Sequence, residues 1–162
     1  MKKVIVIGCP GSGKSTFSRR LRDITGLPLF YLDMIFHNPD KTTVSRNEFD
    51  IRLSEILKGE KWIIDGNYLR TMEKRISECE TVFWLNYPRE VCLDGIKARI
   101  GKSREDMPWI ETECDEELVS FVKSFEKESK PVIQELLKAY SNKEIHIFSS
   151  REESEHYLGT LS

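Results

Sequence analysis

The sequence predicts an α/β fold in which helices cover both faces of a five-stranded parallel sheet. Five short apolar segments alternate with segments of helical periodicity along the chain. Strands that are connected through helices run parallel to one another. The length of 162 residues suits one domain with a core that needs neither disulfides nor metals. We therefore expect a single three-layer domain over residues 1–162.

The first two strands and the helices after them have clear local signals. Lys2–Ile7 is a β-branched run without polar alternation, which is typical of a strand buried on both faces. After a glycine-rich loop, Lys14–Ile24 has apolar residues at helical spacing. Leu29–Leu32 predicts a second strand. Ser45 and Glu48 have the spacing of a capping box, which predicts the start of a further helix.

The third to fifth strands complete the predicted sheet. Trp62–Ile64 and Thr81–Leu85 are apolar segments bounded by turn residues. The second of these leads into a helix expected from Pro88 to about Ile100, because proline is favoured at a helix start. Residues 101–108 are polar and irregular. Glu144–Phe148 is the fifth predicted strand.

The last third of the chain predicts three helices. The acidic run Glu111–Glu117 is typical of a helix N-terminus, where the helix dipole favours negative charge. Pro131 must end or restart the helix that follows, and the apolar face then continues to Tyr140. Arg151–Leu158 is expected to form the closing helix.

The composition excludes several classes of protein. Charged residues make up 32% of the chain and hydrophobic residues 39%. The formal net charge is -2, so the chain lacks the excess of basic residues that is typical of a general nucleic acid binder. Residues 1–81 carry 14 basic and 11 acidic side chains, whereas residues 82–162 carry 11 and 16. No apolar run approaches the ~20 residues of a membrane span. We expect neither a membrane nor a direct nucleic acid partner; oligomeric state is left open.

The four cysteines show neither metal-binding nor disulfide spacing. Cys9, Cys79, Cys92 and Cys114 form no C-x-x-C pair, so a reducing, cytoplasmic location is expected. Cys9 lies among the backbone amides of the glycine-rich loop, so a reactive thiol is an alternative to a purely structural one.

The glycine-rich loop matches the Walker A phosphate-binding motif, G-x-x-x-x-G-K-[ST]. It joins a buried strand to a helix N-terminus, where backbone N–H groups and the helix dipole favour an anion. Lys14 is predicted to reach the β- and γ-phosphates of ATP, and the Ser15 hydroxyl to hold Mg²⁺. The predicted nucleotide-binding residues are Gly8, Pro10, Gly11, Ser12, Gly13, Lys14, Ser15 and Thr16.

Two aspartates follow predicted strands, at the edge where parallel sheets bind ligands. Asp65 ends the third strand and is predicted to help hold Mg²⁺, with a simple turn residue as the alternative. Asp33 follows the second strand. It is expected to contact the acceptor, or to act as a base if the acceptor is a hydroxyl, with a helix cap or turn as the alternative.

Arginines complete the predicted site, because guanidinium groups stabilise a phosphoryl group in transfer. Arg99 and Arg104 flank the polar segment after the fourth strand's helix, and we expect residues 100–109 to form a short lid that brings both over ATP. Arg46 and Arg75 are expected on the acceptor side. For each arginine, the alternative is a solvated surface residue.

Several motifs together resemble one family. They are Gly8–Thr16, Tyr31-Leu32-Asp33, Trp62-Ile63-Ile64-Asp65-Gly66-Asn67-Tyr68, Tyr87-Pro88-Arg89 with Cys92-Leu93, Arg104 before Asp106-Met107, Lys130-Pro131, and Ile147–Ser150 with Glu153. This set is similar to the adenylate-kinase-like P-loop proteins of the DNA topology modulation (FlaR-like) family. The resemblance extends over nearly the whole chain.

The resemblance implies a fold like that of nucleoside monophosphate kinases, with an acceptor-side helical segment over residues 34–58 and a lid. By position, Asp65 resembles the aspartate that orients magnesium-bound water in adenylate kinases, and Arg99 and Arg104 resemble their lid arginines. Asn67 stands where adenylate kinases continue with Phe-Pro-Arg, and we place it among the acceptor contacts. Gly95 stands where the family is expected to have an arginine.

These observations predict an enzyme that uses Mg²⁺ and ATP to phosphorylate a nucleotide or another small molecule. A phosphate acceptor would need arginine clamps, whereas a hydroxyl acceptor would profit from Asp33 as a base, and the sequence does not decide between them. One alternative function is a nucleotide-binding regulator with little turnover, linked to DNA topology or gene expression. The other is a degenerate phosphate loop that binds no nucleotide.

Overall fold

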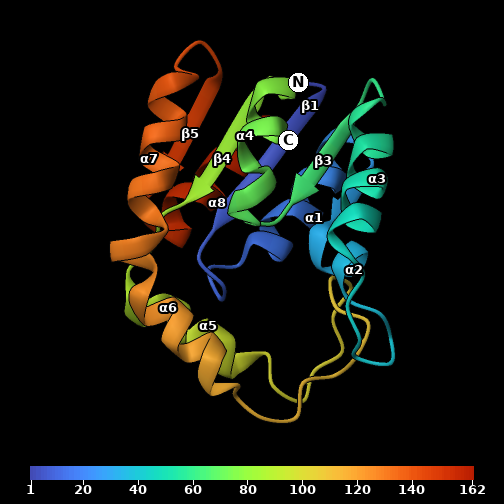
Figure 1. Ribbon diagram of the computed structural model, residues 1–162. Helices are drawn as coiled ribbons and strands as arrows, with labels where there is room; N and C mark the ends of the chain where they lie inside the picture. Colours follow the sequence, from blue (N-terminus) through green and yellow to red (C-terminus); the bar gives the residue numbers. More distant parts are fainter.

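Residues 1–162 are described by a computed structural model, in which a single five-stranded sheet is covered by helices on both faces (Figure 1). Its strands are β1 (Lys3–Gly8), β2 (Leu29–Tyr31), β3 (Trp62–Asp65), β4 (Thr81–Leu85) and β5 (Glu144–Phe148). They run in the order β2-β3-β1-β4-β5, and every neighbouring pair is parallel. The predicted α/β class with a five-stranded parallel sheet is therefore confirmed.

The three central strands form the core of the protein. Every residue of β3 and β4 is buried, and β1 is buried from Val4 onward. This explains why these segments are apolar throughout, because helices cover both of their faces. β5 is an edge strand, and only Phe148 is fully buried in it.

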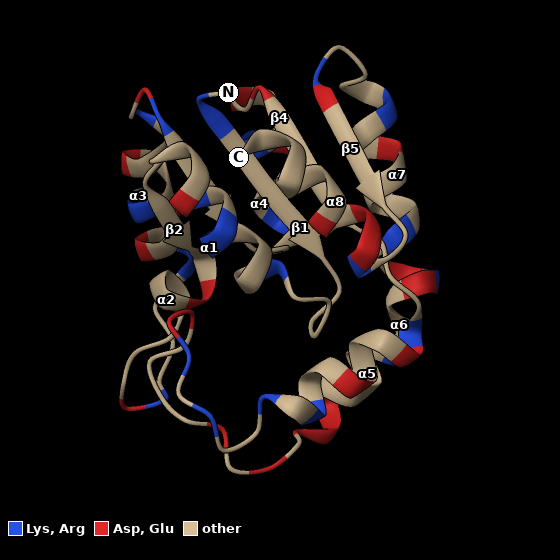
Figure 2. Cartoon of the chain, turned by 180° about the vertical axis from the view of Figure 1, so that it is seen from behind, with Lys and Arg blue, Asp and Glu red and all other residues tan.

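Eight helices surround the sheet. They are α1 (Lys14–Thr25), α2 (Leu32–Phe36), α3 (Arg46–Leu57), α4 (Leu69–Glu78), α5 (Arg89–Ala98), α6 (Glu116–Glu128), α7 (Lys130–Ala139) and α8 (Arg151–Leu161). α1 and α8 lie on one face, and α3, α4 and α7 on the other (Figures 1 and 2). α5 and α6 lie beyond the carboxyl ends of the strands (Figure 1). No helix has the length and apolar character needed to span a membrane.

Two predicted helix boundaries have clear side-chain causes. Ser45 caps α3, because its Oγ accepts a hydrogen bond from the Glu48 N–H at 3.1 Å. The Glu48 carboxylate pairs with Arg52 at 2.8 Å. Pro131 lies in the first turn of α7, and only Ser129 separates this helix from α6. The proline therefore restarts the helix, as predicted, since it cannot occupy a helix interior without losing a backbone hydrogen bond.

Sequence reasoning missed two helices, α2 and α4. Leu69, Met72 and Ile76 have helical spacing and pack against the core, but α4 has no residue that signals its start. Its N-cap is Tyr68, in a left-handed backbone conformation with φ of 40° and no side-chain cap. α2 spans only five residues, too few for a periodic pattern.

The segment between α5 and α6 contains no helix or strand. It covers residues 99–115, so the lid expected over 100–109 lies inside it. The acidic run was expected to open a helix from Glu111, but α6 begins only at Glu116, with Asp115 as its cap. Glu111 instead lies in the irregular segment, where it pairs with arginines. The expected helix start was therefore wrong for residues 111–115, which precede α6.

Candidate active site

A loop between β1 and α1 forms the base of the candidate site. β1 ends at Gly8 and α1 begins at Lys14. Gly11 and Gly13 have φ angles of 84° and 93°, which side chains other than glycine rarely adopt. Gly13 caps α1 without a side-chain hydrogen bond, so the first N–H groups of the helix stay available to an anion.

Asn67 holds the start of this loop. Its Oδ1 accepts a hydrogen bond from the Gly8 N–H at 3.0 Å, and its Nδ2 donates to the Gly8 carbonyl oxygen at 2.5 Å. Both polar groups of the amide are thus engaged by one glycine. Asn67 was predicted to contact the acceptor, but in the structure its side chain binds the backbone of the phosphate loop.

α5 packs directly against the outside of the loop. A Cβ atom at Gly95 would lie 1.9 Å from the Gly11 carbonyl oxygen, and one at Gly11 would lie 2.1 Å from the Cys92 carbonyl oxygen. Two backbones approach this closely only where both residues lack a side chain. This contact explains why glycine, rather than a larger residue, occupies position 95.

Arg151 also holds the loop. It is the first residue of α8, and its guanidinium group donates to the carbonyl oxygens of Ser12 at 3.2 Å and Gly11 at 3.3 Å. The same group lies over the Tyr87 ring, 5.7 Å from its centroid. Arg151 therefore fixes the orientation of two peptide groups of the loop, and it lines the cleft as well.

A cleft of about 1150 Å³ opens above the loop. It is lined by 34 residues from the loop, the strand ends, α5 and segment 99–115. Predicted site residues that line it are Pro10, Gly11, Gly13, Lys14, Ser15, Thr16, Asp33, Asp65, Asn67, Arg99 and Arg104. Ser12 is fully buried beneath the loop. Segments far apart in the sequence therefore meet at the carboxyl ends of the strands.

Asp65 is buried in the floor of this cleft. Its exposed fraction is 6%, and its Oδ2 has no hydrogen-bond partner. Burial raises the pKa of the carboxyl group to about 7, and the carboxylates of Asp33 and Asp106 add to the effect, while Lys14 opposes it. The Lys14 Nζ donates to the Cys9 carbonyl oxygen at 3.4 Å. The Asp65 oxygen that has no hydrogen-bond partner is suited to bind a cation, and the nearby Lys14 ammonium group is suited to bind a phosphate.

Ser15 and Thr16 are held by one arginine of α1. The Ser15 Oγ accepts a hydrogen bond from Arg19 Nη1 at 2.5 Å, and the Thr16 Oγ1 accepts one from Arg19 Nη2 at 3.3 Å. A cation that binds the Ser15 hydroxyl must therefore displace Arg19 from it. Arg19 also lines the cleft, so it is able to turn toward a phosphate instead.

The acceptor contacts predicted for Arg75 and Arg46 are not supported. Arg75 is fully buried and does not line the cleft. Its guanidinium group donates to the carbonyl oxygens of Gly66 (2.9 Å), Asn67 and Tyr68 (3.1 Å). The role predicted for it was therefore wrong, since it holds the turn after β3. Arg46 is exposed at the start of α3, outside the cleft.

Arg99 and Arg104 are brought together by one glutamate. Arg104 Nη2 lies 2.7 Å from Glu111 Oε1, and Arg99 Nε lies 3.7 Å from the same oxygen. Arg104 Nε also lies 3.6 Å from Asp106 Oδ1. Both arginines therefore face the cleft from segment 99–115, although their charges are partly compensated by carboxylates of that segment.

Glu105 fastens this segment to the edge of the sheet. It accepts hydrogen bonds from the Tyr31 hydroxyl at 2.6 Å and from Arg22 Nη1 at 2.8 Å. The hydrogen bonds from Tyr31 and Arg22 lower the pKa of its carboxyl group. Farther along, the Trp109 ring packs edge-on against His37, with ring centroids 5.2 Å apart. The segment thus closes one side of the cleft.

Asp33 lines the cleft from the first turn of α2. Its Oδ1 accepts a hydrogen bond from the Tyr68 hydroxyl at 2.5 Å. Tyr68 also packs against Phe36 and Phe49, with ring centroids 5.5 Å and 5.2 Å away. An aromatic cluster therefore fixes one carboxylate oxygen of Asp33.

Two arginines of the site were missed by sequence reasoning. Arg151 comes shortly after the fifth strand, and the rule that ligands bind at the carboxyl ends of parallel strands was the signal that could have found it. Arg19 follows the Walker motif by one helical turn from Ser15, so its contact with Ser15 follows from the i, i+4 spacing on a helix.

Comparison of the sequence with known proteins gives partial matches to adenylate kinases. The adenylate kinase of Thermotoga maritima is 33% identical over 102 residues, which cover 59% of this chain and 46% of that protein. The one of Thermotoga petrophila is 33% identical over 94 residues, covering 56% and 42%. The chain thus matches less than half the length of these curated relatives. No protein-family model matches it.

Comparison of the structure with solved structures gives matches over almost the whole chain. Shikimate kinase from Acinetobacter baumannii, in complex with shikimate, has a TM-score of 0.66 at 15% identity and covers 99% of this chain and 90% of that one. Shikimate kinase from Bacteroides thetaiotaomicron has a TM-score of 0.60 at 17% identity, covering 98% and 94%. The protein therefore has the fold of the P-loop kinases.

Proposed function

We propose that this protein is a kinase that transfers the γ-phosphoryl group of Mg²⁺-ATP to a small-molecule acceptor. The observation that carries the proposal is the convergence of the phosphate loop, Lys14 and the buried carboxylate of Asp65 on one large cleft. The partial sequence match to adenylate kinases and the fold of the P-loop kinases support the same class of reaction.

The loop and Lys14 supply the phosphate half of the site. The glycine backbone and the N-terminus of α1 offer N–H groups to the β-phosphate, and the Lys14 ammonium offers a mobile charge to the β- and γ-phosphates. Asn67, Gly95 and Arg151 hold the loop in place. Because the donors are fixed before the nucleotide binds, little reorganisation is needed when charge moves during transfer.

The residues at the floor of the cleft fit a magnesium ion. The unpartnered Oδ2 of Asp65 and the hydroxyl of Ser15 are oxygen ligands, which Mg²⁺ prefers. Bound there with ATP, the ion would neutralise charge on the phosphate oxygens. The raised pKa of Asp65 means that ionisation of this carboxyl group and cation binding favour each other.

On the acceptor side we propose a hydroxyl group rather than a phosphate. Neither of the two arginines expected to clamp a phosphate there lines the cleft, and Arg75 is fully buried. Asp33 does line the cleft, and Tyr68 binds only one of its oxygens. The second oxygen is available to take the proton of an attacking hydroxyl.

Arg99 and Arg104 are proposed to stabilise the phosphoryl group in transfer. They face the cleft from segment 99–115 and share Glu111 as a partner. A γ-phosphate that entered beside them would compete with Glu111 for their guanidinium groups. This segment is therefore the proposed lid.

The deciding experiment measures ADP release from Mg²⁺-ATP in the presence of hydroxyl metabolites, nucleosides and nucleoside monophosphates, with Lys14→Ala as the blank. We expect one hydroxyl compound to stimulate release, and Asp33→Asn to reduce the stimulated rate about a hundredfold or more, the range of general base catalysis. Stimulation only by monophosphates would contradict the hydroxyl assignment. ATP binding without stimulation by any class would favour a nucleotide-binding regulator.

A further inference from the structure

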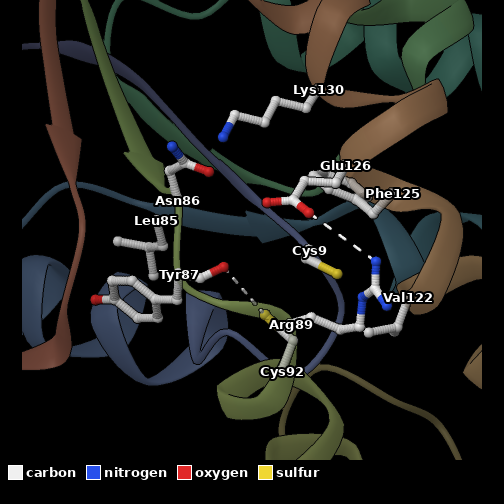
Figure 3. Close-up of a pocket in the computed structure, with 10 residues that line it drawn as sticks. All are labelled: Cys9, Leu85, Asn86, Tyr87, Arg89, Cys92, Val122, Phe125, Glu126 and Lys130. Carbon is white, nitrogen blue, oxygen red and sulfur yellow. Dashed lines mark hydrogen bonds and ion pairs between the residues drawn. The ribbon is translucent and has the colours of Figure 1, made fainter.

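Two of the four cysteines line one small cavity where the phosphate loop packs against α5. Cys9 is the second residue of the loop motif and Cys92 lies in the first turn of α5, with exposed fractions of 6% and 1%. Both line a cavity of about 20 Å³ (Figure 3). The close approach of the Gly11 and Cys92 backbones keeps the two side chains in this position.

The cavity is large enough for a very small reagent. A water molecule needs roughly 10–15 Å³ of such space, so a peroxide enters where a bulky thiol reagent does not. Polar groups of Asn86, Arg89 and Lys130 line the same cavity (Figure 3). A small polar oxidant would therefore find hydrogen-bonding partners within the cavity.

The charges around Cys92 favour its thiolate form. Its interaction with the Cys9 side chain lowers its pKa, and the charges of Lys14 and Arg151 lower it further, while burial opposes them. The same interaction, together with burial, raises the pKa of Cys9. The thiolate is the nucleophile in thiol oxidation, so the reaction begins at Cys92.

We propose that Cys9 and Cys92 form an oxidative modification site, at which hydrogen peroxide links them in a disulfide that ties the phosphate loop to α5. The Cys92 thiolate attacks one peroxide oxygen, the O–O bond breaks, and the departing hydroxide takes up a proton to become water. Cys9 sulfur then attacks the resulting sulfenic acid, and the second water leaves with the Cys9 proton. The two thiols together lose two electrons, and one peroxide molecule is reduced to two water molecules.

The other cysteines lack this arrangement and serve as controls. Cys79 lies at the end of α4, where its Sγ donates to the Ile76 carbonyl oxygen at 3.2 Å. Burial raises the pKa of this thiol to about 11. Cys114 lies in segment 99–115 and does not line the cavity.

The disulfide would also change phosphate binding, an effect that rests on the proposed function. A disulfide brings its sulfur atoms to about 2.05 Å, closer than two thiols in contact. Cys9 must therefore shift toward α5, and the N–H groups of the adjacent glycines shift with it. We expect the oxidised protein to bind Mg²⁺-ADP at least about tenfold more weakly, with full recovery after reduction.

The test exposes the reduced full-length protein to hydrogen peroxide, blocks the remaining thiols, and analyses a tryptic digest by mass spectrometry without reduction. We expect the peptide Val4–Lys14 joined to Glu90–Lys97, with the loss of two hydrogens, and its disappearance after reduction. Cys92→Ala should abolish this product, whereas Cys79→Ser should form it as the wild type does. Circular dichroism of each variant verifies that it is folded.

Three results would overturn the inference: no linked peptide in the folded wild type, a disulfide that involves Cys79 or Cys114 instead, or the same yield in Cys92→Ala. An unchanged affinity of the linked protein for Mg²⁺-ADP would overturn its effect on phosphate binding. If the reduced protein binds no Mg²⁺-ADP, the proposed kinase function fails, but the linked peptide still decides the oxidation site.

Discussion

Lys14 is the side chain on which the proposed chemistry depends most directly. It is half-buried at the start of α1 and packs in no part of the core. Lys14→Ala is therefore expected to abolish turnover while leaving the thermal unfolding midpoint nearly unchanged, measured by ADP release and by circular dichroism. Lys138→Ala, which removes a lysine whose side chain is 77% exposed, is the control. A collapse of the midpoint in Lys14→Ala alone would indicate a structural lysine.

Arg151 acts on the phosphate loop without being part of the motif. Removing its two hydrogen bonds to loop carbonyls should let the loop sample other peptide orientations. Because a hydrogen bond from a charged group contributes about 1.5–3 kcal/mol, Arg151→Ala is expected to weaken Mg²⁺-ADP binding about tenfold by calorimetry.

Arg151→Lys should recover only part of this affinity, because lysine lacks the planar fork that binds two carbonyls. Arg20→Ala provides the control, since Arg20 forms only an exposed ion pair with Glu155 at 3.4 Å. Equal affinities of the wild type and Arg151→Ala would show that the loop holds its shape unaided.

The contact between the phosphate loop and α5 is expected to tolerate no side chain. Gly95→Ala would place a Cβ atom 1.9 Å from the Gly11 carbonyl oxygen, so either α5 or the loop must move. We expect a lower unfolding midpoint and weaker Mg²⁺-ADP binding.

Gly159→Ala is the matched control, because Gly159 lies in α8 and a Cβ atom added there would have no other atom within 4 Å. There the substitution should stabilise the protein by up to about 1 kcal/mol through helix propensity. Similar effects of the two substitutions, measured by urea unfolding, would rule out the close contact as the reason for glycine at position 95.

Segment 99–115 is expected to affect the reaction rate more than nucleotide binding. Arg104 is bound by Glu111 and Asp106 while it faces the cleft, so its contact with the phosphoryl group would form mainly during transfer. Arg104→Ala should lower kcat more than it raises the dissociation constant for ATP. Lys97→Ala, at an exposed position of α5 outside the cleft, should change both little. Equal losses of rate and affinity in Arg104→Ala would make Arg104 a binding residue.

For the molecule as a whole, the buried carboxyl group of Asp65 links stability to pH. Burial raises its pKa from 3.8 to about 7, so the folded state holds this proton more tightly than the unfolded state. The contribution of Asp65 to stability should therefore fall as pH rises from about 4 to about 7, by at most about 1.4 kcal/mol per pH unit.

Asp65→Asn removes this dependence. The difference in unfolding free energy, variant minus wild type, should increase between pH 5 and pH 7 and then stay constant. Urea unfolding at each pH measures this difference. Asp50→Asn is the control, because the Asp50 carboxylate is exposed and pairs with Arg70. The same difference between Asp65→Asn and wild type at pH 5 and pH 8 would contradict the raised pKa.

Local patterns predicted most of the fold. β4 and β5 have the predicted bounds, and α1 begins at the predicted residue, because periodicity and glycine positions act within a few residues. α4 was missed because its start depends on the backbone of Tyr68, which no capping residue signals. Of the predicted site residues, Lys14, Asp33, Asp65, Arg99 and Arg104 line one cleft, and their roles there stay predictions.

The amino-acid sequence determined the strand and helix order, the phosphate loop and the aspartates at the strand ends, because each depends on neighbouring residues. Only the tertiary structure decided what the polar side chains contact. Arg75 is buried and binds carbonyl oxygens of the turn after β3. Asn67 binds the backbone of Gly8, and Arg151 binds carbonyl oxygens of the phosphate loop. These roles depend on the distance and direction between elements far apart in the chain, which are set when the sheet and its helices pack together.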